Sequence, residues 1–235
     1  MVDRVGVSWV HAFRDVLLIV VSILIAFSLD AWWGGQAREA QEHESLTALH
    51  AELQASRTEL DSVVIHNELL VARARAYLKL DQGTVARLER DSLLFVYGGL
   101  FGGMTFDPSV GAIEAILAGG LDLLTNVQLR AAVAAWPGML REIEVDQWAI
   151  VERWEKLSDA LVDAGLGIEF FETRTDEGID EEALRSLLIG TMEHPRLRQR
   201  VAALAGSVMG LLDELGDVEI RLQQLEDMVA TELGP

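Results

Sequence analysis

The sequence predicts an all-α membrane protein in which one N-terminal transmembrane helix continues into a helical bundle. Three observations support this fold class. An apolar run near the N-terminus approaches the length of a membrane span, two long stretches repeat apolar residues every three or four positions, and no convincing alternation of apolar and polar residues predicts a strand.

The first predicted element is the transmembrane helix. Residues 16–29 carry no charge, but these fourteen residues are too few to cross a hydrocarbon core of about 30 Å. Extended to residues 15–33, the helix reaches about 28 Å at about 1.5 Å per residue. A buried core helix and a cleaved signal peptide are the alternatives. Apolarity on every face is unusual for a core helix, and no convincing small-x-small cleavage motif follows the run.

Polar and aromatic residues mark the two ends of this span. Asp15 and Asp30 would lie at its boundaries, and Trp32 and Trp33 fall where an aromatic belt is expected. The span would lead directly into the next helix, unless Gly34 and the glycine after it loosen the connection.

The distribution of basic residues predicts the orientation. Arg4 and Arg14 lie in residues 1–14, a short cytoplasmic or interfacial segment, whereas only Arg38 lies close behind the span. Because basic residues favour the cytoplasmic side, we expect the N-terminus in the cytoplasm of a bacterium, the span in its inner membrane, and residues 36–235 in the periplasm.

Two features near the span indicate contacts with other helices. Ser22 and Ala26 form a small-x-x-x-small pair, which lets another helix approach closely. Val5, Trp9 and Phe13 recur every four residues, as in a short helix at the membrane interface or in a cytoplasmic extension of the span. Trp9 is therefore a candidate partner contact.

The strongest periodic signal predicts a long helix over residues 195–233, which Pro195 opens. Its apolar residues follow a 4-3 spacing without one failure, and they define a continuous seam along the helix. The members of this seam are Leu197, Val201, Leu204, Val208, Leu211, Leu215, Val218, Leu222, Leu225 and Val229.

A second seam predicts a long helix over about residues 36–80. Its members are Leu46, Leu49, Leu53, Ser56, Leu60, Val63, Asn67, Leu70, Ala74 and Tyr77. Two helices of matching length and pattern most simply pack on each other in one bundle. The alternative is pairing with a second copy of the chain, in which Asn67 would set the register.

Shorter helices are predicted between the two long ones. Asp107 and Pro108 resemble a helix start, with the aspartate as cap and the proline at the first position. Thr125 or Asn126 would cap the next helix, and Pro137 would interrupt the chain before a helix that carries tryptophans.

The charge of the chain excludes one class of function. There are 38 acidic and 19 basic residues, and 35 acidic and 17 basic residues lie beyond residue 35, a net charge of about −18 on the domain. Nucleic-acid binding is disfavoured, because it needs clusters of Lys and Arg.

The chain has no cysteine, which excludes disulfides and thiolate chemistry.

The sequence predicts no catalytic residue, no metal site and no cofactor. His43 and His50 are seven residues apart and Glu39 precedes them by one turn, but an ordinary surface role is the better interpretation. The paired glycines at residues 98–99, 102–103 and 119–120 lack the flanking strand and lysine of a phosphate site. Asp180 is interpreted as a helix cap and not as a calcium ligand.

Arg196, Arg198 and Arg200 lie in the first turns of the last predicted helix, where the helix dipole disfavours cations. The ordinary interpretation is that they pair with the acidic stretch before the helix. The sharper one is that they contact an acidic partner.

Three tryptophans lie in the middle of the chain. We interpret Trp136, Trp148 and Trp154 as core or interdomain anchors, and an exposed one among them would mark a contact surface.

Two blocks carry a resemblance to a family. The run DVLLIVVSILIAFSLDAWW, followed by ESLTALHAELQASRTEL, resembles an uncharacterised group of bacterial single-span proteins, whose span ends in Asp or Asn shortly before Trp. The stretch FDPSVGAIEAILAGGLDLLTNVQLRAAVAAW is similar to the second block of that group. Together the two blocks cover roughly residues 15–145. Many relatives carry paired Asn before a single Trp, where this chain has Ser-Leu-Asp-Ala-Trp-Trp. The resemblance implies an anchored extracytoplasmic helical domain without assigned catalysis, and it supplies no functional residues.

These observations favour a non-enzymatic structural or accessory subunit of a bacterial membrane complex. Its expected partners are the lipid bilayer and other membrane protein subunits, and a homo-oligomer with a second copy of the chain is a further option. In plan the chain is similar to single-span accessory subunits of photosynthetic or respiratory complexes. The alternative is an extracytoplasmic sensor or ligand-binding module, with a pocket among residues 84–165. An enzyme is the third hypothesis.

Overall fold

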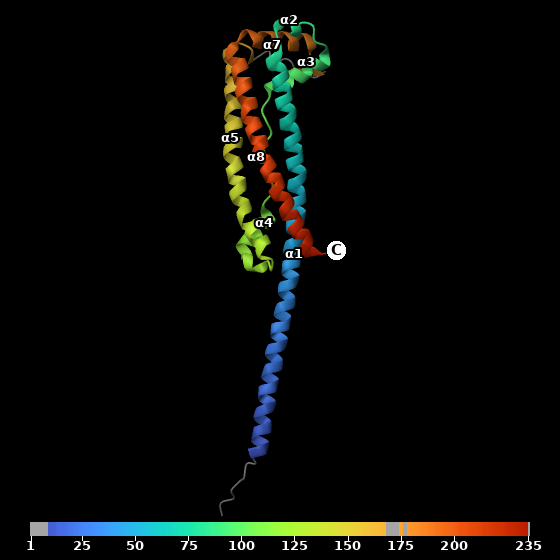
Figure 1. The fold of residues 1–235 in the computed structure, drawn as a ribbon, viewed down its shortest axis with the longest axis vertical. Coiled ribbons are helices and arrows are strands. Elements are labelled where there is room, and N and C mark those ends of the chain that lie inside the picture. Colours follow the sequence, from blue (N-terminus) through green and yellow to red (C-terminus); the bar gives the residue numbers. More distant parts are fainter. Residues whose placement is uncertain (1–8, 168–173, 176–177, 235) are drawn as a thin grey trace, which may run out of the picture.

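The computed structural model describes residues 9–167, 174–175 and 178–234, and these residues form the predicted all-α fold (Figure 1). Three long helices make up its body: α1 (Trp9–Lys79), α5 (Val127–Asp163) and α8 (Pro195–Leu233). The shorter helices are α2 (Gln82–Val85), α3 (Arg90–Tyr97), η1 (Gly98–Leu100), α4 (Gly111–Gly119), η2 (Leu121–Leu123) and α7 (Glu181–Glu193). Two strands of two residues, β1 (Arg174–Thr175) and β2 (Gly178–Ile179), pair antiparallel.

The predicted span and the first seam helix are one element. α1 is a single helix of 71 residues. It does not break at Gly34 or Gly35, and both glycines lie in open space. Figure 1 shows the first half of α1 projecting from the bundle as a lone rod. The apolar stretch is therefore joined to the bundle by continuous helix.

α8 packs antiparallel along α1. Arg198 at the start of α8 donates to the Leu80 carbonyl at the end of α1 at 3.1 Å, and Arg57 reaches Glu226 near the end of α8 at 2.9 Å. Every member of both predicted seams is buried, the polar Ser56 and Asn67 included. The prediction that the two helices pack on each other is confirmed. The alternative, that the first seam pairs with a second copy, is wrong, because this chain already buries it.

α5 lies on the other flank of α8, and its buried residues complete the core. The interruption predicted at Pro137 is wrong, since α5 runs through this residue. The proline removes one helical hydrogen bond, while Trp136 and Ile143, buried before and after it, hold the helix on the core. The predicted cap by Asn126 is confirmed: its side chain accepts from two N–H groups of the first turn at 2.8 and 3.0 Å.

Between α3 and α5 the chain returns along α1. Residues 101–110 form neither helix nor strand, and we call them the extended chain because they run along α1, where Met104 contacts Asn67 and Asp107 contacts Glu59. The helix start predicted at residues 107–108 is wrong, and α4 begins only at Gly111. The cap comes from another helix: the Glu52 carboxylate on α1 accepts from two N–H groups in the first turn of α4 at 2.6 and 3.2 Å. An anion from a distant helix thus replaces the local cap at the positive end of the α4 dipole.

Two buried side-chain amides hold the extended chain. Asn67 on α1 donates to the carbonyl and accepts from the N–H of Met104, both at 2.9 Å. Gln147 on α5 forms the same pair of hydrogen bonds with Phe106. It accepts from the Phe106 N–H, and it donates to the Phe106 carbonyl at 3.0 Å. Each amide takes the place of a neighbouring strand, so these backbone groups are paired although the chain passes between helices. Asn67 therefore sets the position of this chain and not the register of a dimer.

α2, α3 and α7 close the end of the bundle that lies away from the projecting part of α1 (Figure 1). Gly99 allows η1 to lie against α1, because a Cβ there would be 2.7 Å from the Ala74 nitrogen. The predicted cap by Asp180 is confirmed, since its carboxylate accepts from the Ala183 N–H at 2.7 Å.

Candidate functional site

The projecting part of α1 is the first candidate site. It carries an apolar stretch whose mean hydropathy reaches 2.3 and of which nothing is buried by the rest of the protein. The exposed fraction of its large apolar side chains runs from 43% at Val21 to 69% at Phe27. In length and composition this helix could span a membrane.

The polar groups inside this stretch are satisfied by the helix itself. Ser22 donates to the Leu18 carbonyl at 2.8 Å, and Ser28 donates to the Leu24 carbonyl at 2.7 Å. A hydroxyl in hydrocarbon needs such a partner, so both serines suit a lipid environment. Ala26 is exposed, one turn after Ser22.

The predicted boundary residues lie where a belt would need them. Asp30, Trp32 and Trp33 are all exposed on α1, directly after the apolar stretch. Asp15 and Trp9 lie within α1, but their side chains fall outside the part of the chain that the structure describes.

The three arginines of α8 divide into two kinds. Arg196 and Arg200 are exposed and remain candidate contacts. Arg198 is half-buried, and its guanidinium donates to the carbonyls of Leu78 and Leu80 at the end of α1. Instead of pairing with an acidic stretch, Arg198 supplies donors to the negative end of the α1 dipole.

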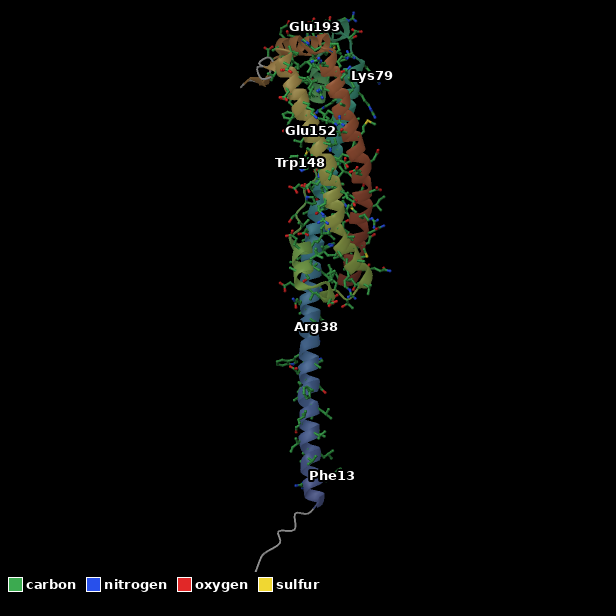
Figure 2. All side chains as sticks on the ribbon, turned by 90° about the vertical axis from the view of Figure 1, so that its left-hand side faces the viewer. Phe13, Arg38, Lys79, Trp148, Glu152 and Glu193 are labelled. Atoms are coloured by element: carbon green, nitrogen blue, oxygen red, sulfur yellow. The ribbon has the colours of Figure 1, made fainter. Side chains whose placement is uncertain are left out.

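The three tryptophans divide in the same way. Trp136 is buried, and Trp154 packs against Gly102, where a Cβ would come within 2.9 Å of its ring. Trp148 is 65% exposed, and Figure 2 shows it on the surface of the bundle. Trp148 is therefore the tryptophan that the sequence-based expectation singles out as a candidate contact.

Trp148 borders a hollow of about 400 Å³ between α5 and the extended chain. We call it the Trp148 hollow; it is lined by Thr105, Phe106, Asp107, Pro108, Val110, Leu140, Arg141, Glu144, Gln147, Trp148 and Val151. Its shape depends on the extended chain, which Gln147 fixes through Phe106. The hollow lies within residues 84–165, where the binding-module hypothesis places a pocket. The sequence could not reveal its lining, because it forms between segments that the sequence predicts as separate helices.

A pair of acids joins α5 and α8. Burial and the adjacent carboxylate of Asp146, with which Glu214 shares a hydrogen bond, raise the pKa of Glu214 to about 7. Glu142 and Asp217 add repulsion in the same direction. Ionisation of Glu214 would place a second negative charge beside Asp146 at the contact between α5 and α8.

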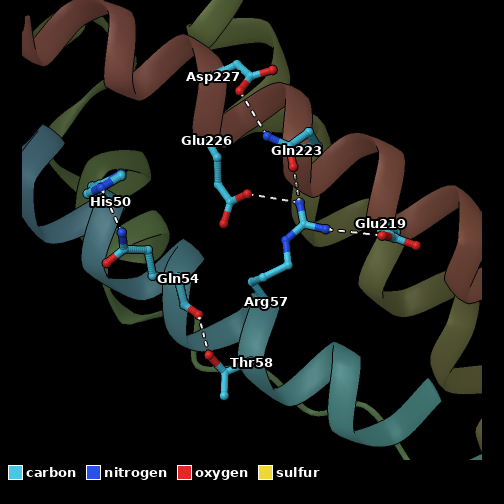
Figure 3. A network of polar contacts seen from close by, with 8 residues as sticks. All are labelled: His50, Gln54, Arg57, Thr58, Glu219, Gln223, Glu226 and Asp227. Atoms are coloured by element: carbon cyan, nitrogen blue, oxygen red, sulfur yellow. Dashed lines mark hydrogen bonds and ion pairs between the residues drawn. The ribbon is translucent and has the colours of Figure 1, made fainter. Parts of the chain in front are cut away.

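Arg57 forms the main polar link between α1 and α8, shown in Figure 3. It donates to Gln223 at 3.0 Å and pairs with Glu226 at 2.9 Å, while Glu219 lies at 3.5 Å. His50, weighed above as a metal ligand, lies 3.0 Å from the Gln54 amide. Across the described residues, no group of three His, Asp or Glu side chains is arranged to hold a metal ion.

Comparisons with protein-family models, with curated proteins and with solved structures found no match for this chain.

Proposed function

We propose that the chain is a non-enzymatic accessory subunit of a bacterial membrane complex, in which α1 anchors the bundle and holds the Trp148 hollow at a fixed height above the bilayer. The observation that carries this proposal is the continuity of α1 from the apolar stretch to the top of the bundle. A rigid connection suits a protein that positions a surface, whereas a flexible tether would not.

The height follows from the contacts of the extended chain. Asp107 lines the hollow, and its N–H donates to Glu59 on α1 at 2.8 Å. Glu59 is 26 residues beyond Trp33, which corresponds to about 39 Å of helix. The hollow would therefore meet the part of a neighbouring subunit that stands well clear of the lipid.

The chemistry of the hollow indicates what binds there. Trp148 and Val145 are exposed apolar side chains on one face of α5, and buried tryptophans dominate the binding energy of many interfaces. Among the residues that line the hollow with Trp148, Asp107 and Glu144 are acidic and Arg141 is basic. The partner surface should accept an indole ring and present groups of opposite charge to these three side chains.

The cellular setting is part of the proposal. The basic residues before the span favour a cytoplasmic N-terminus and a periplasmic bundle in the bacterial inner membrane. There the subunit would belong to an assembly such as a photosynthetic or respiratory complex, and no nucleic acid would be a partner.

Purification of the chain from its own membrane in mild detergent tests this proposal. We expect a membrane protein to co-purify in fixed ratio, and to be lost in high salt and in Trp148→Ala. The matched control is Val162→Ala, because Val162 is also 65% exposed on α5 but lies outside the hollow. A chain that purifies without any other subunit, or equal retention by both variants, contradicts it.

The second candidate is a ligand-binding module, which the size of the Trp148 hollow favours, since ligand pockets commonly start at about 300 Å³. A small molecule that fills the hollow should raise the melting temperature of the wild-type chain. It should not do so in Leu140→Trp, in which the added ring occupies the hollow.

A further inference from the structure

A strip of uncharged residues follows the outer face of α1. We call it the outer strip; its members are Ala48, Ala51, Ala55, Thr58, Ser62, Ile65, Leu69, Ala72 and Ala76. They recur with an alternating spacing of three and four, so they share one face of the helix. All are exposed except Ala76, which is half-buried.

The contacts of α1 explain why the strip is uncovered. The core seam occupies the opposite face of the helix. α8 lies on one flank, where Arg57 contacts it, and the extended chain lies on the other, where Asn67 and Glu59 hold it. In Figure 1, α5 lies on the far side of α8 from α1. The outer strip therefore points away from the described bundle.

The absence of charge is unusual for this protein. The matching outward positions of α8 include Asp213, Asp217 and Asp227, and the whole chain carries a net charge of −19. The strip instead exposes two large apolar side chains, Ile65 at 66% and Leu69 at 37%. Apolar residues at helical spacing on an exposed face are typical of a surface that another helix covers.

We propose that the outer strip is the contact between two copies of this chain, whose α1 helices lie side by side and parallel. Both copies sit in the same bilayer with the same orientation, so each strip meets its own counterpart around a two-fold axis normal to the membrane. Elsewhere the acidic surfaces of two copies repel, whereas the strip brings no charges together. Its alanines, serine and threonine let the two helices approach closely.

The residues that flank the strip are complementary in the parallel arrangement. In a parallel pair of helices, each flanking residue faces the one five positions later in the other copy. Asp61 of one copy then faces His66 of the other, and Glu68 comes near Arg73, whose guanidinium its own chain packs against Phe95 and Gly98. An antiparallel pair is excluded by the common anchor.

Because the chain has no cysteine, single cysteines can test this contact directly in membranes. Under mild oxidation we expect disulfide-linked dimers for Ser62→Cys and Leu69→Cys. The matched controls are Ile220→Cys on α8 and Val145→Cys on α5, which are also exposed and should remain monomeric. Equal cross-linking at all four positions, or none at the strip, overturns the proposal, as does capture of a different protein at the strip alone.

A charge in the strip provides the second test. In mild detergent at high salt, where the proposed partner is lost, the wild-type chain should have twice the protein mass of 25.9 kDa, and Leu69→Glu should reduce it to one copy without a change in helix content. Ile220→Glu should stay dimeric. Trp148→Ala should also stay dimeric, so failure of this proposal and failure of the accessory-subunit proposal are distinguishable. A monomeric wild-type chain overturns it.

Discussion

The two halves of α1 are made of similar residues but have opposite surroundings. Between residues 16 and 29 large apolar side chains cover every face of the helix and all are exposed. Between residues 46 and 77 apolar side chains are concentrated on the face that α8 and the extended chain bury.

This difference indicates which surroundings suit each half of α1. The second half obtains its apolar surroundings from the rest of the chain, so it needs only one apolar face. The first half obtains none from the described protein, and apolarity on all faces is stable only where the surroundings are apolar on all sides. One helix thus joins a part that folds against protein to a part that fits lipid.

The largest expected effect comes from charges in the first half. Val20→Arg combined with Leu24→Arg should release the chain from the membrane, because each arginine near the centre of a span costs about 2.5–3.5 kcal/mol. The measurement is the fraction of chain that stays with alkali-washed membranes. Ile220→Arg, an exposed position on α8, should not reduce that fraction. Retention of the double variant would mean that the stretch does not span.

The next largest effect is on stability, and it distinguishes the buried face from the exposed face in the second half of α1. Leu53 is buried in the seam, and Leu53→Ala should lower the free energy of unfolding by about 3 kcal/mol through the cavity it leaves. Ile65→Ala on the outer face, measured in the monomeric Leu69→Glu background, should change it by less than about 0.5 kcal/mol. Denaturant titration followed by circular dichroism provides both values, and similar losses would contradict the assigned faces.

A smaller effect is expected where the second half holds the extended chain. Asn67→Leu removes both hydrogen bonds to Met104 and should cost about 2 kcal/mol, because a buried N–H and a carbonyl lose their partner. Gln54→Leu, at an exposed position of the same helix, is the control. Hydrogen exchange at the Met104 amide should accelerate in Asn67→Leu alone. Unchanged exchange would contradict the two hydrogen bonds between Asn67 and Met104.

The smallest effect concerns the acidic pair between α5 and α8. Because folding raises the pKa of Glu214 to about 7, the folded state holds this proton more tightly than the unfolded state. Its contribution to stability is complete below the unfolded pKa of about 4.5 and is lost as the pH rises through about 7.

Replacement of Glu214 tests this sign. At pH 8, Glu214→Gln should raise the melting temperature by about 2–4 °C, the shift that about 1 kcal/mol produces in a domain of this size. At pH 4 the variant and the wild type should melt together. Equal stabilisation at both pH values would show that ionisation is not the cause.

The elements that the sequence predicts well are those that local patterns determine. The seams of α1 and α8 are correct at every position, because each depends only on the spacing within one helix. The caps by Asn126 and Asp180 are also local, since each side chain reaches the N–H groups of the turn that follows it.

The misses depend on residues that are distant in the sequence. Residues 101–110 stay extended because Asn67 and Gln147 pair with their backbone, and α4 starts late because Glu52 caps it. These partners lie 37 to 60 residues away, and periodicity carries no information about them. The Trp148 hollow follows from the same contacts, so the sequence predicts a pocket within residues 84–165 but not the residues that line it.

The contact that Arg198 makes could not be predicted from the sequence for a similar reason. The Arg198 guanidinium donates to the carbonyl of Leu80 at the end of α1, which lies 118 residues earlier in the sequence. Arg196 and Arg200 point outward from the same turns and keep the predicted role as a hypothesis.

One rigid helix, α1, joins the apolar stretch to the bundle through Gly34 and Gly35. Spin labels on Ser28→Cys and Gln54→Cys test it in lipid nanodiscs, with an excess of unlabelled chain so that only distances within one copy are seen. The 26 residues between the labels predict one narrow distance near 39 Å, and replacing both glycines with alanine should not change it. A broad distribution that extends to much shorter distances, and that narrows in the alanine variant, would reveal a hinge and contradict the claim.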